Sequence, residues 1–150
     1  MNYLATFVNS KIGQIRDDMQ LEINKTEYWL NEILLQPKCV SKNERCEVCS
    51  SREVQYNLEL HHLAGRKHDY RTVTVCRRCH NMLSESQKTW DKRWLQDNQP
   101  ENARMAFLLL GLHDVLVLRS RLAVNDVCYR VAVSLRQKIS DLQITQEVCV

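Results

Sequence analysis

The chain has 150 residues, of which 44% are hydrophobic, and a formal net charge of +3. This size suits one domain, or a small core with helical additions, and the composition is ordinary for a globular protein. Only three glycines and two prolines are present, which favours helices over a sandwich or barrel with many turns. The sequence shows no run of 18 uncharged apolar residues and no signal peptide, so we expect no membrane partner and a cytoplasmic location.

The positive charge is concentrated in one part of the chain. Residues 42–93 carry 11 Lys and Arg against seven Asp and Glu, whereas the remaining residues are slightly acidic. Such a basic segment attracts a polyanion such as DNA, although a solvated surface has the same composition.

The first predicted element is one long helix over residues 3–36, which Pro37 ends. Its apolar residues recur at roughly helical spacing: Ile12, Ile15, Met19, Ile23, Leu30, Ile33 and Leu34. A polar linker over residues 38–45 follows. Beyond it, residues 54–61 alternate between apolar and polar side chains, which predicts a half-buried strand.

Residues 72–75 are β-branched and predict a second strand. A charged loop from Gly65 to Arg71 joins the two strands into an antiparallel hairpin, with the connection at the end that carries His61 and His62. A helix is predicted over residues 79–95, packing Trp90 and Trp94 onto the hairpin.

Two more helices are predicted over residues 101–124 and 127–148, after a break at residues 97–100. The first contains a strongly apolar stretch at residues 103–118 that charged side chains interrupt, which argues against a membrane span. We expect this stretch to pack against the first helix or to form a homodimer interface.

The sequence contains two Cys-x-x-Cys pairs, Cys46 with Cys49 and Cys76 with Cys79. Two such pairs supply four thiolates to one tetrahedral Zn²⁺, as in structural zinc sites. Seven cysteines in all, an odd number, argue against a fully paired disulfide framework. Three histidines, His61, His62 and His80, surround the pairs and exceed what the zinc shell needs, so they are candidates for chemistry.

The stretch from Cys46 to Trp94 resembles the HNH endonuclease family. The ordered signals are the first cysteine pair, a strand ending in two histidines, a loop, a second strand, Cys-x-x-Cys-His and a helix. The resemblance implies an α+β, mainly helical fold: a zinc-stapled ββα-metal (His-Me finger) core with long flanking helices. The expected segments are an N-terminal helical segment at 1–38, the nuclease core at 39–97 and a C-terminal helical hairpin at 98–150.

The resemblance also implies roles for the three histidines. Carried over from the family, His61 and His80 hold a catalytic divalent ion, Mg²⁺ or another such as Mn²⁺ or Ni²⁺, and His62 is the general base. Hydrolysis of a phosphodiester needs an activated water and a cation that offsets charge on the phosphoryl oxygens and the leaving 3′-oxygen. Imidazole is mostly neutral at pH 7, which suits the base.

Two positions depart from the family pattern. Arg71 stands where the family has its central Asn, so another group, with Asp69 a candidate, would orient His62. Ser84 stands where some members have a further histidine, so the divalent ion would have few protein ligands and would rely on water and phosphate, as Mg²⁺ does.

The expected partner is double-stranded DNA, contacted at phosphates by five basic residues around the histidines: Arg66, Lys67, Arg71, Arg77 and Arg78. The resemblance therefore implies a metal-dependent HNH-type DNA endonuclease. The alternative is a non-catalytic zinc-finger-like module that binds DNA or acts as an adaptor, which the two departures favour. A third possibility is a helical protein–protein module in which zinc only stabilises the fold.

Overall fold

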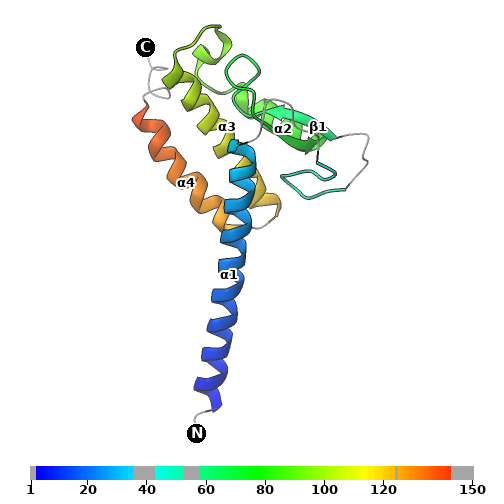
Figure 1. Cartoon of the computed structure of the whole chain (residues 1–150), viewed down its shortest axis with the longest axis vertical. Coiled ribbons are helices and arrows are strands. Elements are labelled where there is room, and N and C mark those ends of the chain that lie inside the picture. The colour runs from blue at the N-terminus through cyan, green and yellow to red at the C-terminus, as the bar shows by residue number, and fades with distance from the viewer. Residues whose placement is uncertain (1–2, 36–42, 53–57, 124, 143–150) are drawn as a thin grey trace. The chain divides into compact units, whose positions relative to one another are not determined.

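The computed structural model describes residues 3–35, 43–52, 58–123 and 125–142. Within them the chain is mainly helical with one small sheet, as expected (Figure 1). It divides into two compact units, residues 1–35 and 36–150, which are described separately. Across the described residues, no helix combines the length and apolar character that a membrane span requires.

The first unit is the single helix α1 (Tyr3–Leu35). It confirms the long helix expected from the apolar spacing, up to the last residue described before Pro37. The predicted linker at 38–45 lies mostly outside the described residues.

The second unit is built around an antiparallel hairpin of β1 (Leu58–His62) and β2 (Thr72–Cys76). Leu58 pairs with Cys76 and His62 with Thr72, so the connecting loop starts directly after the two histidines. The hairpin and its connection confirm the prediction. The first part of the predicted strand, residues 53–57, lies outside the described residues.

Helix α2 (Arg77–Gln87) follows β2 without a break and ends earlier than predicted. The expected single helix over 79–95 is wrong in its second half, which forms a turn and the short 3-10 helix η2 (Lys92–Leu95). Two contacts explain the break. The Asp91 carboxylate accepts the Arg93 backbone N–H and caps η2, and the Trp94 indole N–H donates to the Ala64 carbonyl at 2.8 Å.

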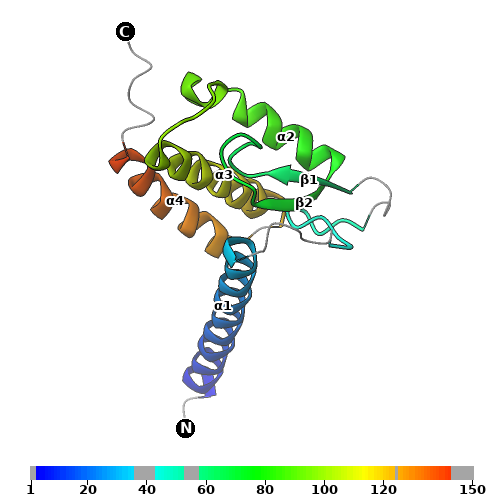
Figure 2. The same ribbon diagram turned by 45° about the horizontal axis from the view of Figure 1, so that its top comes forward.

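Helices α3 (Glu101–Leu122) and α4 (Asp126–Asp141) complete the unit. They confirm the predicted pair where the chain is described; residues 143–148 are not. In both views α3 lies between α4 on one side and the hairpin with α2 on the other (Figures 1 and 2). The apolar side chains of α3 are therefore buried inside the unit, among them Phe107, Leu112, Val115 and Leu116. The stretch that suggested a dimer interface is already covered.

Gly111 allows α3 to lie directly against the loop that follows the two histidines. A Cβ atom at this position would stand 2.0 Å from the Leu63 carbonyl oxygen, closer than any real contact. Because the neighbouring atom is backbone, no side-chain rotation relieves the clash. The close approach is what ties α3 to the end of β1.

We predict that Gly111→Ala destabilises the fold by about 3 kcal/mol, because overpacking must displace the Leu63 backbone. The measurement is the free energy of unfolding in urea. Gly13→Ala is the matched control, since a Cβ there meets nothing within 4 Å and alanine is the better helix former. Equal stability of Gly111→Ala and wild type would show that α3 does not press on this loop.

Candidate functional site

The four cysteines of the two pairs meet at one place in the second unit. Their sulfur atoms all lie within 4.8 Å of one another, the only such group of three or more potential ligands among the described residues. Cys46 and Cys49 bracket a turn, and the Cys49 backbone N–H donates to the Cys46 sulfur at 3.4 Å. Cys76 ends β2 and Cys79 lies in the first turn of α2. The cluster therefore joins the turn, the sheet and the helix.

The turn between the first pair is itself held on the sheet. The Glu47 backbone N–H donates to the Thr74 carbonyl at 2.8 Å, and the Glu47 carboxylate accepts the Thr74 N–H at 2.5 Å. From α3, the Arg119 guanidinium donates to the Glu47 carbonyl. These contacts hold the turn that carries Cys46 and Cys49 against β2 and α3.

The thiols influence one another's ionisation. A hydrogen bond from Cys79 lowers the pKa of Cys46 to about 4, and the same contact raises the pKa of Cys79. Burial raises the pKa of Cys49. Four thiolates packed together repel one another, so they stay ionised together only around a cation. Four thiolate donors suit a tetrahedral zinc ion.

His61 and His80 lie side by side between β1 and α2. Their ring centroids are 5.2 Å apart and the rings are nearly perpendicular. The His61 side chain is buried, with 4% of its surface exposed. Burial, and then the charge of His80 and His62, lowers the pKa of His61 to about 4, although Asp114 opposes this. His61 is thus neutral at pH 7, the state in which imidazole binds metals.

His62 is half-buried and shares with His61 and His80 a pocket of about 300 Å³. Burial, with the positive charge of Arg66, lowers the pKa of His62, although Asp69 opposes this. His62 is therefore unprotonated at pH 7 and able to accept a proton. The three histidines selected from the sequence therefore line one pocket.

Gln87 holds the backbone at His62, a contact that the sequence analysis missed. This side chain, 7% exposed, lies in the last turn of α2. Its amide donates to the carbonyls of His62 at 3.0 Å and of Leu63 at 3.1 Å. The His62 carbonyl also accepts the Gly65 backbone N–H at 3.2 Å. Loss of the Gln87 amide would therefore cost chiefly the Leu63 carbonyl its partner, at about 1–3 kcal/mol. Only the tertiary fold brings the residues together, since they are more than 20 positions apart in the sequence.

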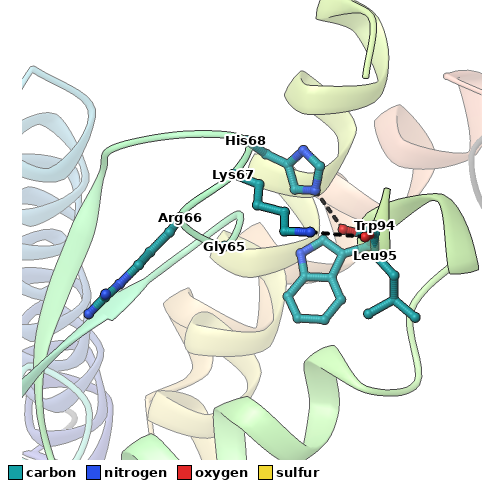
Figure 3. Close-up of a pocket in the computed structure, with 6 residues that line it drawn as sticks. All are labelled: Gly65, Arg66, Lys67, His68, Trp94 and Leu95. Atoms are coloured by element: carbon teal, nitrogen blue, oxygen red, sulfur yellow. Dashed lines mark hydrogen bonds between the residues drawn. The ribbon is translucent and has the colours of Figure 1, made fainter. Parts of the chain in front are cut away.

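The loop after His62 is held against η2 by hydrogen bonds. The residues of this loop and of η2 line a pocket of about 240 Å³, and Figure 3 draws these residues. His68 lies 2.7 Å through its Nε2 from the Trp94 carbonyl oxygen. The Lys67 ammonium donates to the Leu95 carbonyl at 3.1 Å and pairs with Asp97 at 2.9 Å. Figure 3 shows Arg66 extending away from Trp94 and Leu95. Lys67 is thus engaged by the fold, and Arg66 projects elsewhere.

The other basic residues predicted to contact phosphate differ in their surroundings. The Arg71 guanidinium pairs with Asp69 at 2.7 Å, and the Arg71 backbone N–H donates to the same carboxylate at 2.8 Å. Asp69 therefore stabilises the loop before β2 through its contacts with Arg71. Arg77 lies 3.8 Å from Glu59. Arg78 is exposed at the start of α2. Arg66 and Arg78 are accordingly the strongest candidates for phosphate contacts.

Glu59 is a second residue that the sequence analysis did not select. Its carboxylate lies 3.5 Å from His80 Nδ1. Glu59 and His61 are two residues apart on β1, so their side chains share one face of the strand. Ser84 Oγ approaches the same nitrogen, at 3.4 Å. The period of two in this strand was visible in the sequence and could have identified Glu59.

His113 and Asp114 form a hydrogen-bond network outside the pocket that the three histidines line, although the Asp114 charge still acts on His61. The Asp114 carboxylate accepts hydrogen bonds from Ser86 Oγ at 2.6 Å and the Trp90 indole at 3.0 Å. His113 lies 3.0 Å from the same carboxylate, and Arg136 of α4 donates to its other nitrogen at 2.8 Å. The network ties α3 to α4 and to the turn that follows α2.

Comparisons with protein-family models, with curated proteins and with solved structures gave no match. Any function of the site is therefore inferred from its residues and their geometry.

Proposed function

We propose that this protein is a metal-dependent HNH-type DNA endonuclease whose ββα core is stabilised by zinc. The observation that carries the proposal is the shared pocket of His61, His62 and His80, built directly beside a cluster of four cysteines. Cys46, Cys49, Cys76 and Cys79 hold the structural Zn²⁺. A divalent ion, Mg²⁺ or one such as Mn²⁺ or Ni²⁺, is the catalytic cofactor.

Each histidine has a separate task in this reaction. His61 and His80 would hold the divalent ion, which would supply positive charge to offset the phosphoryl oxygens and the leaving 3′-oxygen. His62, whose pKa is lowered by burial, takes the proton from the attacking water. Gln87 donates to the His62 carbonyl, which restricts the movement of the backbone that carries the imidazole. Arg66 and Arg78 supply phosphate contacts that orient double-stranded DNA.

The proposal is tested by adding metals back to the protein. Zinc-loaded protein cleared of other divalent ions is mixed with an end-labelled DNA duplex, and Mg²⁺, Mn²⁺ or Ni²⁺ is added. We expect cleavage that depends on the added ion and leaves a free 3′-hydroxyl. Cleavage that continues in EDTA would contradict the proposed metal chemistry.

The alternative, a non-catalytic module that binds DNA or acts as an adaptor, is supported by one observation. Arg71, at the position of the family's Asn, pairs with Asp69 at 2.7 Å, so the group expected to orient His62 is engaged by Arg71. Salt-dependent DNA binding without cleavage in any metal would favour this alternative. Absence of DNA binding at low salt would favour a protein–protein module.

Some family members have a further histidine ligand where this chain has Ser84. In this chain, Glu59 takes the place of that ligand. A carboxylate with two histidines is a common donor set for divalent ions with open coordination positions. Rotation of the Glu59 side chain, 38% exposed, would turn its carboxylate from Arg77 towards an ion on His80. We therefore assign Glu59 as the third protein ligand of the proposed site.

We predict that Glu59→Gln raises the Mn²⁺ concentration for half-maximal cleavage by about tenfold, because a neutral amide binds a hard cation less well. Titration calorimetry with Mn²⁺ should show the same loss of affinity. Glu85→Gln, which removes an α2 carboxylate that pairs with Lys88 just beyond the helix end, is the control and should leave both values unchanged. An unaltered Mn²⁺ affinity in Glu59→Gln would restrict Glu59 to its ion pair with Arg77.

A further inference from the structure

Helix α1 carries an apolar stripe with a regular repeat. Its members are separated by four, four, three, four and four residues: Leu4, Val8, Ile12, Ile15, Met19 and Ile23. Each of them exposes at least 40% of its surface. The second three follow the first three at a distance of 11 residues, so the stripe stays almost parallel to the helix axis. A stripe of this kind is suited to pairing along its whole length with another helix.

The length of α1 makes such pairing physically reasonable. With 33 residues, the helix extends over about 50 Å. A helix with a continuous exposed apolar face is stabilised by packing more than by its intrinsic propensity. Large exposed apolar patches on soluble proteins mark interaction surfaces.

The charges of α1 identify the partner as a second copy of the same helix. Lys11 and Arg16 are the only charged residues between positions 3 and 16. The second half, positions 17–35, holds a single Lys against five acidic residues: Asp17, Asp18, Glu22, Glu27 and Glu32. The helix is therefore positive in its first half and negative in its second.

This charge distribution also determines the direction of pairing. In an antiparallel pair, the positive half of each copy lies beside the negative half of the other. On a helix of 100° per residue, Lys11 and Glu22 lie along one edge of the stripe, and Arg16 and Glu27 along the other. A parallel pair would instead place like charges together. We infer that α1 pairs with α1 of a second copy as an antiparallel two-helix coiled coil.

The test of pairing is the mass of the full chain in solution, by light scattering over a range of micromolar concentrations. Wild type should be a dimer. Ile15→Asp, which puts a charge into the stripe, should weaken the dimer by at least about a hundredfold in dissociation constant. Leu21→Asp introduces the same charge at an exposed apolar position on the opposite face of α1, and it should remain a dimer.

The direction of pairing is tested by exchanging charges. Lys11→Glu with Arg16→Glu should weaken an antiparallel dimer by about tenfold, and adding Glu22→Lys with Glu27→Lys should restore it. A monomeric wild type, or a dimer that Ile15→Asp leaves intact, would overturn the inference; the latter would direct attention to the C-terminal helices. Charge reversal without effect would exclude the antiparallel arrangement.

Discussion

Replacing His62 by alanine is expected to lower the single-turnover rate of DNA cleavage by about 10²- to 10⁴-fold, the range for loss of a general base. The structure gives the physical reason. His62 lies in the same pocket as His61 and His80, and burial lowers its pKa, so the neutral imidazole is available at pH 7. The side chain is half-buried, so its loss leaves only a small cavity.

The same variant should keep its zinc, its melting temperature within a few degrees and its affinity for DNA. Those three measurements separate loss of the base from loss of the fold. His113→Ala is a useful comparison, because His113 takes part in the Asp114 and Arg136 network outside the pocket. We expect it to lower stability and to retain cleavage. Similar cleavage rates for His62→Ala and wild type would assign the base to another group.

Replacing Cys79 by serine is expected to remove the bound zinc and to unfold much of the second unit. Cys79 is fully buried in the first turn of α2, and the cluster joins that helix to β2 and to the turn at residues 46–49. A structural zinc contributes about 10–16 kcal/mol in small zinc domains, more than the total stability of most single domains. Loss of one thiolate therefore outweighs the remaining contacts.

The measurements are zinc content per chain and helicity by circular dichroism. Cys128→Ser is the matched control, since Cys128 is equally buried but lies in α4 outside the cluster. It should retain one zinc ion and lose only about 1–3 kcal/mol of stability. Full zinc occupancy and an unchanged melting temperature in Cys79→Ser would contradict a structural role for the cluster.

Local sequence patterns predicted the parts of the fold that depend on local chemistry. The Cys-x-x-Cys spacing predicted a four-thiol cluster, and the period of two before His61 predicted a hairpin that closes at the histidines. Both features are set by residues close together in the chain. The resemblance to HNH endonucleases added the roles of the histidines, which stay a proposal, as do the DNA partner and the cytoplasmic location.

What the sequence did not predict depends on contacts between distant residues. Helix α2 ends at Gln87 because the Trp90 and Trp94 indoles find acceptors at Asp114 and Ala64, on other elements. In the sequence, Gln87 has no feature that distinguishes it from other polar helix residues. In the fold, its side-chain amide donates to the His62 carbonyl. The apolar stretch at 103–118 suggested an interface, whereas its side chains fill the core of the unit. The sequence around Gly111 does not indicate that the Leu63 backbone lies against this residue.

Conversion of supercoiled plasmid by zinc-loaded wild-type protein and His62→Ala, side by side in Mn²⁺ and in EDTA, tests the proposed activity most directly. The account predicts nicked or linear DNA from wild type in Mn²⁺, none in EDTA, and at least a hundredfold slower conversion by the variant. Intact plasmid from folded wild-type protein, in Mn²⁺ and equally in Mg²⁺ and Ni²⁺, would contradict the nuclease. The same pocket would then belong to a zinc-stabilised binding module.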